Sequence, residues 1–232
     1  MAVLVTLFVN LGFWQLRRLE ERRQANLVIA ARLTDEPLPV ETLVDAAGAD
    51  LDSLEFRPAT ATGVFEADAE VMVRSQVFQG IAGFHVLTPL VLADQRALVV
   101  NRGWIPLSDG EPPASAASPV GTVNIEGLVM LSQVPTALGP KDTAEGRLDV
   151  LSRVDLDRLA VQMEWPLLPV YLAMTEPAPS LPRVLPPPNV ADEGPHLGYA
   201  VQWFGFAAVA LIGFVALIRR ATSDRAGHPR HD

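Results

Sequence analysis

The chain lacks cysteine altogether among its 232 residues. This absence excludes disulfide bonds, thiolate metal sites, CxxC redox pairs and a cysteine nucleophile. Histidine is scarce as well: the chain has only His85, His196, His228 and His231, which are too scattered to form a spaced zinc site. The sequence also contains no GxSxG, Walker, GxGxxG or HExxH motif. We therefore expect that the protein is not an enzyme.

Basic residues are few in the middle of the chain and are outnumbered by acidic ones. Between Thr34 and Pro195 there are 9 basic and 23 acidic residues, a net charge of -14, whereas the whole chain carries -9. A protein that binds nucleic acid needs a basic surface to neutralise phosphates. We therefore expect no nucleic-acid partner. The apolar residues, in contrast, are concentrated at the two ends of the chain.

The longer apolar run lies near the C-terminus. Leu197 to Ile218 is a stretch of 22 residues without a charged side chain. As a helix it would be about 33 Å long, which matches the hydrocarbon core of a bilayer, about 30 Å thick. The sequence predicts a transmembrane helix over residues 196–220, followed by a cytoplasmic tail at 221–232.

A shorter apolar run, Ala2–Leu16, opens the chain. Its 15 residues span only about 22 Å as a helix. No positively charged segment precedes this run and no small-residue cleavage site follows it, so a cleaved signal peptide is not indicated. We interpret residues 1–33 as a first transmembrane helix with its extension, and we expect a start codon upstream that supplies the missing turns.

The middle, residues 34–195, has the pattern of a β-rich domain. Short runs rich in Val, Phe and Leu alternate with Gly, Pro and Asp, which predicts strands separated by turns. The expected strands are 56–65, 70–78, 84–92, 97–105, 121–131 and 167–174. A short helix is expected over Asp155–Met163, a loop over Glu111–Pro119, and an extended proline-rich return over Pro166–Pro195.

The predicted fold class is thus an α+β membrane protein. Two transmembrane helices flank a β-rich domain, an antiparallel sheet or open barrel with one or two helices. Arg219 and Arg220 follow the second span and Asp192 and Glu193 precede it. The positive-inside rule then predicts that both termini are cytoplasmic and the acidic domain lies outside.

His196 is the strongest candidate for a ligand-binding residue. Tyr199, Ala200 and Trp203 follow it at i+3, i+4 and i+7, on one face of a helix. A neutral imidazole beside aromatic and small side chains is typical of an axial ligand to haem iron. The alternative is a polar cap with interfacial aromatic residues, as in any membrane anchor. Gln202 is a second unusual residue, because polar side chains inside a bilayer usually face protein.

Two further patterns have less specific interpretations. Arg102 and Trp104 follow one another closely on a strand, either as an exposed contact pair for a partner or as a packed bulge. Gly205, Val209 and Gly213 form a stripe of small residues, and Gly12 is small as well. Small residues let two membrane helices approach closely, so both patterns predict tight helix packing.

Five sequence blocks together resemble the Surfeit locus protein 1 family of cytochrome c oxidase assembly factors. They occur in the family's order and cover nearly the whole chain: LGFWQLRR at Leu11–Arg18, FRPATATGVF at Phe56–Phe65, GFHVLTPL at Gly83–Leu90, VVNRGWIP at Val99–Pro106 and PHLGYAVQWFGFA at Pro195–Ala207. The last two are the most specific. The resemblance implies two spans with a domain outside a bacterial inner membrane or in the mitochondrial intermembrane space.

The resemblance also implies a function, to help place haem a in oxidase subunit I. Some bacterial members are thought to hold haem a through a histidine that corresponds to His196. The expected partners are oxidase subunit I, the haem a synthase and the lipid bilayer. We expect Gln15, Arg17, Gln202 and Trp203 to shape the haem site together with Tyr199, while Arg102 and Trp104 contact a partner.

Two alternatives remain open from the sequence. The first is a protein-binding chaperone that stabilises an oxidase intermediate and never holds haem. The second is a membrane-anchored sensor, which would need a cytoplasmic output domain. Residues Arg219–Asp232 are too short for such a domain. The need for His196 separates the haem carrier from the chaperone.

Overall fold

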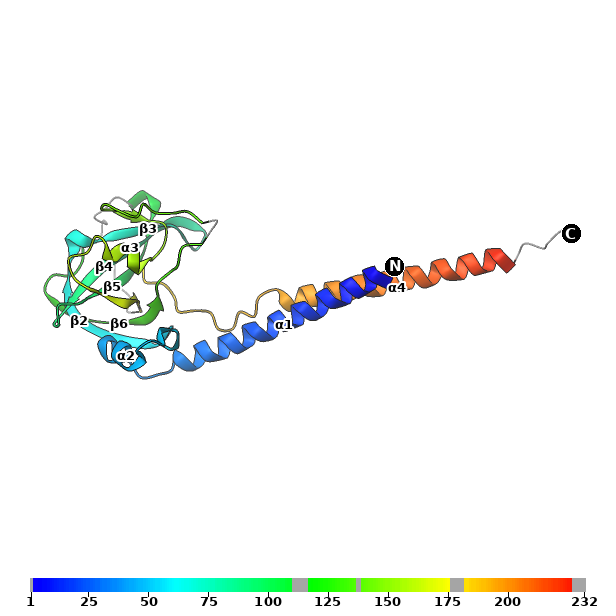
Figure 1. The fold of residues 1–232 in the computed structure, drawn as a ribbon, viewed down its shortest axis with the longest axis horizontal. Coiled ribbons are helices and arrows are strands. Elements are labelled where there is room, and N and C mark those ends of the chain that lie inside the picture. The colour runs from blue at the N-terminus through cyan, green and yellow to red at the C-terminus, as the bar shows by residue number, and fades with distance from the viewer. Residues whose placement is uncertain (1, 110–116, 137–138, 176–181, 227–232) are drawn as a thin grey trace. The chain divides into compact units, whose positions relative to one another are not determined.

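A computed structural model describes residues 2–109, 117–136, 139–175 and 182–226. The chain forms two compact units, each described by itself below. The first unit joins Met1–Ala30 to Asn189–Asp232, and the second comprises Ala31–Pro188. Helices α1 (Ala2–Arg32) and α4 (His196–Ala226) dominate the first unit, and an eight-stranded sheet dominates the second (Figure 1).

The strands of the second unit follow the predicted runs closely. Their bounds are β1 Leu38–Pro39, β2 Pro58–Phe65, β3 Val71–Phe78, β4 Ile81–Leu92, β5 Ala97–Pro106, β6 Thr122–Leu131, β7 Val150–Leu151 and β8 Leu167–Met174. The helices are α2 Val40–Ala47 and α3 Leu156–Ala160, with 3-10 turns at Leu51–Leu54, Ala67–Ala69 and Leu107–Asp109. All six predicted strands are confirmed, and the two-residue strands β1 and β7 were not predicted.

Five strands close into a barrel, which corrects the prediction of an open one. The strand order is β1-β2-β6-β8-β5-β4-β3-β7, and β2 also pairs with β4. Gly63, Val64 and Phe65 of β2 pair with Leu92, Val91 and Leu90 of β4. A side chain at Gly63 would place a Cβ only 2.4 Å from the carbonyl oxygen of Val91, so this closure requires glycine.

The sheet is mixed, whereas an antiparallel sheet was expected. The neighbouring strands β5 and β8 run parallel, as do β3 and β7, and β1 and β2. Parallel neighbours cannot be joined by a tight turn, and in this chain β6 and the segment that contains α3 separate β5 from β8. Gln79 and Gly80 form the turn between β3 and β4, and their φ values of 51° and 80° are those that a type I′ turn demands.

The barrel is filled by aliphatic side chains, and each small helix of the domain packs on a different cluster of them. Helix α2 contributes Val40 and Leu43 to the cluster that contains Leu90 and Leu98 of neighbouring strands. Helix α3 contributes Leu156 and Leu159 to a second cluster with β3, β4 and β5. Each fully buried Leu or Val stabilises the fold by about 1.5–3 kcal/mol.

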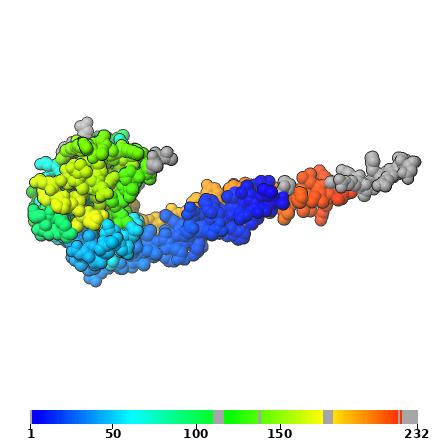
Figure 2. Space-filling view, in the orientation of Figure 1, coloured from blue at the N-terminus to red at the C-terminus, as the bar shows by residue number. Residues whose placement is uncertain are grey.

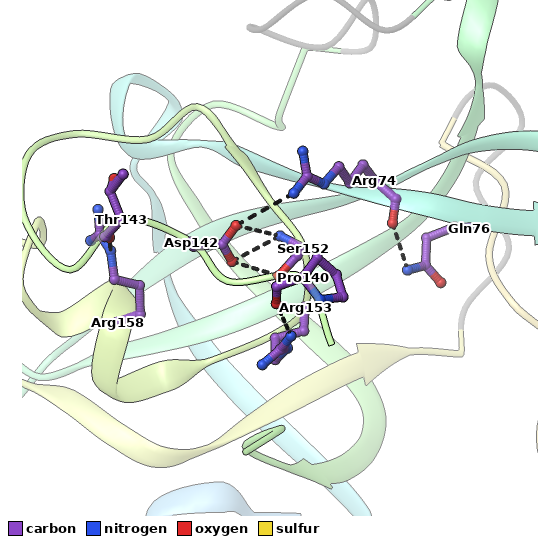
Figure 3. A network of polar contacts seen from close by, with 8 residues as sticks. All are labelled: Arg74, Gln76, Pro140, Asp142, Thr143, Ser152, Arg153 and Arg158. Atoms are coloured by element: carbon purple, nitrogen blue, oxygen red, sulfur yellow. Dashed lines mark hydrogen bonds and ion pairs between the residues drawn. The ribbon is translucent and has the colours of Figure 1, made fainter. Parts of the chain in front are cut away.

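Helix α3 is shorter than predicted and is held by polar contacts. Asp155 caps it by accepting the backbone N–H of Arg158 at 3.0 Å, as expected. The helix ends at Ala160, three residues before the predicted end. Arg158 is buried and donates to the carbonyl oxygens of Thr143 and Gly146. Asp142 accepts from the backbone N–H and the hydroxyl of Ser152 (Figure 3). These bonds fix the irregular segment before β7 onto α3.

The first unit consists of two long helices that lie side by side. In Figures 1 and 2, α4 continues past the N-terminal end of α1. Within the part of the chain that the structure describes, His196–Arg220 is the one helical stretch long and apolar enough to cross a membrane, with a mean hydropathy of 2.2. Its outer side chains, such as Val209 and Ile212, are about 70% exposed (70% and 69%). The apolar run at the start of α1, Ala2–Leu16, has only 15 residues, fewer than the roughly 20 that a membrane-spanning helix needs.

Candidate functional site between helices α1 and α4

The two long helices meet along a narrow seam. The buried residues of α1 are Gly12, Gln15, Leu19 and Asn26, which recur at intervals of three, four and seven. Such intervals place side chains on one helical face. On α4 the seam includes Ala200 and Ala207, which are 1% and 7% exposed. The helices therefore approach closely at small residues such as Gly12 and Ala200, as the sequence predicted for Gly12.

The predicted residues His196 and Gln15 meet in this seam although they lie 181 positions apart. The imidazole Nδ1 is 2.9 Å from the amide oxygen Oε1 of Gln15. Gln15 is buried with 9% exposure, and His196, the first residue of α4, is half-buried. A buried amide oxygen requires a donor, so the His196 Nδ1–H donates to Gln15.

Aromatic side chains surround the seam further along α4. Trp203 is half-buried and stacks on Phe8 of α1, with ring centroids 5.7 Å apart and an interplanar angle of 28°. Phe206 completes the group, 5.8 Å from Phe8. The structure thus brings Trp203 to the same face as His196, two turns deeper along α4. A flat apolar group thus lies on the same helix face as the imidazole, about 10 Å further along the helix axis.

Three other predicted site residues lie at the surface of the helix pair. Tyr199 is 48% exposed, and Gln202 and Arg17 are exposed as well. The buried face of α4 is centred between His196 and Ala200, so positions 199 and 202 rotate away from it at about 100° per residue. Gln202 therefore does not face the first helix, although a polar side chain within a membrane span was expected to face protein. A haem-binding role for these three residues stays a prediction.

A group of polar residues just before His196 was not predicted from the sequence. We call it the polar clasp; its members are Arg22, Arg23, Asn26, Asp192 and Glu193. Arg23 of α1 binds the carboxylate of Glu193 through two hydrogen bonds of 2.8 and 2.9 Å. The hydrogen bond from Arg23 lowers the pKa of Glu193. Asn26, which is 7% exposed, and Arg22 both donate to the carbonyl oxygen of Asp192. The spacing of Gln15, Leu19 and Asn26 was the available signal, because it continues one helical face beyond the apolar run.

A shallow cavity of about 310 Å³ adjoins this clasp. Apolar side chains of Leu27, Ala30, Val190 and Ala191 line it together with the Arg23–Glu193 pair. All of these residues belong to the helix-pair unit. The clasp thus holds the chain that enters α4 against α1, which fixes the position of His196.

The small-residue stripe on α4 does not pack as predicted. A Cβ built on Gly205 or Gly213 would meet no atom within 4 Å, and Val209 is 70% exposed. The stripe therefore faces away from α1 in the described helix pair. Gly12, in contrast, would place a Cβ 2.6 Å from the ring of Phe204, so a larger residue cannot fit there without a shift.

Arg102 and Trp104, the predicted partner contacts, lie in the sheet domain and are buried. Their exposed fractions are 6% and 3%. Arg102 donates to the carboxylate of Glu70 at 3.0 Å, and Thr88 donates to the same oxygen at 2.7 Å. The guanidinium of Arg102 also lies 5.7 Å from the ring of Phe65. These contacts favour the packed-bulge interpretation, and a partner contact stays a prediction.

His85 also belongs to the sheet, as the sequence indicated. Burial lowers the pKa of His85 to about 4. Asn101 accepts the backbone N–H of Gly103 through its amide oxygen, so its amide nitrogen faces His85 Nδ1 at 3.3 Å. The lone pair of His85 Nδ1 is therefore already engaged.

The described residues contain no group of three or more His, Asp or Glu side chains that could hold a bare metal ion. A lone histidine suits a different ligand. Haem iron already has four nitrogen ligands from the macrocycle and needs only an axial side chain from the protein. His196 offers a nitrogen donor, and the Phe8–Trp203 group offers an apolar surface two turns further along the same face of α4. The residues of the seam thus fit the group that the sequence predicts.

Comparisons with known proteins find similarity over most of the chain. The SURF1 family model matches residues 2–208. The chain is similar to an uncharacterized SURF1-like protein of Mycobacterium tuberculosis, with 29% identity over 100% of this chain and 89% of the relative. It is 31% identical to a SURF1-like protein of Monosiga brevicollis, over 94% of this chain and 85% of that protein. It is also 25% identical to Surfeit locus protein 1 of Rattus norvegicus, over 91% of this chain and 72% of that protein.

Proposed function

Because the chain belongs to the SURF1 family, we propose that it is an assembly factor for cytochrome c oxidase that holds haem a at His196 and delivers it to oxidase subunit I. The observation that carries this proposal is the placement of His196 at the helix seam, bonded to Gln15 and on the same face of α4 as Trp203, which stacks on Phe8. The protein catalyses no bond change in this role.

The proposed location follows from the helix pair. Helix α4 crosses the bacterial inner membrane and α1 accompanies it as a second span, with both termini in the cytoplasm. The seam supports this arrangement, since α1 pairs with the stretch of α4 that is long and apolar enough to span a bilayer. The acidic sheet domain is then outside, where it contacts subunit I or the haem a synthase.

Each group in the seam has a distinct part in holding the ligand. When bound, haem a would supply an iron that accepts a nitrogen ligand and a largely apolar macrocycle. The imidazole of His196 would hold the haem through a ring nitrogen, and the Phe8–Trp203 group would offer it an apolar surface. Arg17 is exposed on α1 two residues after Gln15, and an arginine could bind the carboxylates of a haem by charge-assisted hydrogen bonds.

A second candidate is a chaperone that never holds haem. The same bond between Gln15 and His196 favours it, because a hydrogen bond between two helices can serve packing alone. In that case the function resides in the sheet domain, and His196 can be replaced without loss of oxidase assembly.

The visible spectrum of the detergent-purified protein, co-expressed with the enzymes of haem a synthesis, tests the proposal. We expect a haem a band in the wild type, a loss of the band in His196→Ala, and equal amounts of both proteins in the membrane fraction. His231→Ala is the matched control and should keep the band. No band in the wild type while subunit I still co-purifies would reject the carrier and favour the chaperone.

A further inference from the structure

Gln15 has an unusual position for a polar side chain. It lies within the last turn of the apolar run Ala2–Leu16 and is buried in the helix seam with 9% exposure. Burial of an amide in apolar surroundings costs free energy unless a hydrogen bond compensates. His196 Nδ1 provides that bond at 2.9 Å. The pair is therefore the preferred arrangement of both side chains.

The direction of this hydrogen bond determines which imidazole nitrogen carries the proton and which keeps its lone pair. An amide oxygen can only accept, so Nδ1 of His196 carries the proton in the neutral ring. The lone pair then resides on Nε2. No hydrogen bond to Nε2 occurs among the residues that the structure describes. Nε2 is thus a nitrogen donor with a free lone pair at the edge of the seam.

The orientation of the ring is fixed from the other side as well. The Arg23–Glu193 pair and the bond from Asn26 to the Asp192 carbonyl hold the backbone just before His196. The side chain of His196 can rotate only about its own bonds, and Gln15 removes that freedom.

We infer that Gln15 is a positioning residue that holds His196 in the Nδ1–H tautomer and presents Nε2 to a haem iron. The inference rests on the proposed function for the identity of the ligand, but the tautomer of His196 is independent of it. Partners that orient a ligating histidine typically contribute 10- to 100-fold in affinity. Gln15 has this effect through the ring and does not itself touch the iron.

The first experiment needs no ligand. Nuclear magnetic resonance of the full chain, labelled with ¹⁵N at histidine and held in detergent, reports the tautomer of each ring, and the spectrum of His196→Ala identifies the His196 signals. We expect the Nδ1–H form in the wild type and in Gln15→Glu, which keeps an acceptor. In Gln15→Leu we expect a mixture of tautomers. An Nε2–H form in the wild type would overturn the inference.

The second experiment uses ferric protoporphyrin IX as the probe, titrated into the same detergent-purified proteins and followed by its visible absorption. We expect Gln15→Leu to bind about 10- to 100-fold more weakly than the wild type, and Gln15→Glu to retain most of the affinity. Gln24→Leu, the same change at an exposed glutamine of α1, is the control and should bind as the wild type does.

The two experiments separate the possible failures. Probe binding that His196→Ala abolishes and Gln15→Leu leaves unchanged would reject the positioning role and keep the proposed function. A wild type that binds no probe but shows the Nδ1–H tautomer would reject the haem carrier and keep Gln15 as the group that orients His196. Equal loss in Gln15→Leu and Gln15→Glu would reject the acceptor role, because the glutamate retains it.

Discussion

His85 in the sheet domain and His196 in the helix pair each place Nδ1 against a side-chain amide, with opposite consequences. Asn101 turns its amide nitrogen to His85, so the ring accepts and its lone pair is used. Gln15 turns its amide oxygen to His196, so the ring donates and its other nitrogen keeps a lone pair. The partner of the ring therefore decides which histidine can bind a ligand, and the residue type alone does not.

The same difference separates the two regions. In the sheet domain the buried polar side chains of Glu70, Thr88 and Arg102 are paired with one another. In the helix pair a partly buried histidine keeps one nitrogen unbonded within the described residues. We expect substitutions in the first region to change stability, and substitutions in the second to change ligand binding.

The largest effect is expected for Arg102→Leu. This change leaves the carboxylate of Glu70, which is 5% exposed, without its guanidinium partner. Removal of one member of a buried ion pair typically costs about 3–5 kcal/mol. Chemical denaturation of the purified protein, followed by circular dichroism, should report this loss.

The double variant Glu70→Met/Arg102→Leu is the matched control, since it removes both charges. We expect it to recover much of the loss. A variant Arg102→Leu with wild-type stability that no longer co-purifies with subunit I would contradict this prediction. That result would support the predicted partner contact of Arg102.

The second effect concerns His85 and pH. Because the pKa of His85 is lowered to about 4 in the folded state, against about 6.5 in the unfolded chain, the unfolded state binds more protons between these values. The contribution of neutral His85 to the free energy of unfolding is fully present above pH 6.5. It is lost progressively as the pH falls from 6.5 toward 4. By pH 5 the loss is about 2 kcal/mol.

Urea denaturation of the wild type and His85→Gln at pH 7.5 and pH 5 measures this contribution. The wild type should lose about 2 kcal/mol more than the variant between the two pH values. Parallel losses in both proteins would mean that His85 is not the group that titrates.

The strands could be predicted from the sequence because their signals are local. Alternating apolar runs and the Gln79-Gly80 turn set the bounds of β3 and β4 within three residues of those expected. The closure of the barrel and the parallel pairing of β5 with β8 depend on contacts between distant strands, which local patterns do not contain. Gly63 was one available signal, because a glycine within a strand often marks a close approach of another backbone.

The candidate site was predicted in part for the same reason. His196, Gln15 and Trp203 occur within or next to the two apolar runs of the sequence, and the structure places them in one seam. The rotation of α4 about its axis depends on which face packs on α1. The sequence could not indicate that Ala200 and Ala207 form this face, so the exposure of Tyr199 and Gln202 was not foreseen.

The smallest effect tests the seam that holds His196 and Gln15 together. In Gly12→Ala the new methyl group meets the ring of Phe204 at 2.6 Å, so the helices must separate or Phe204 must move. Overpacking of this kind costs about 1 kcal/mol or slightly more. The cysteine-free chain allows a direct measurement: Phe8→Cys and Trp203→Cys, introduced together, can be joined by a short thiol-reactive cross-linker.

We expect Gly12→Ala to slow this cross-linking, and Gly205→Ala to leave it unchanged, because a Cβ at Gly205 meets no atom within 4 Å. Both variants exchange glycine for alanine within a helix, so they gain the same helix propensity and differ only in the space available. Equal rates in the two variants would mean that Gly12 does not set the distance between the helices. The Gln15–His196 bond would then determine their approach, and Gln15→Leu should slow the cross-linking instead.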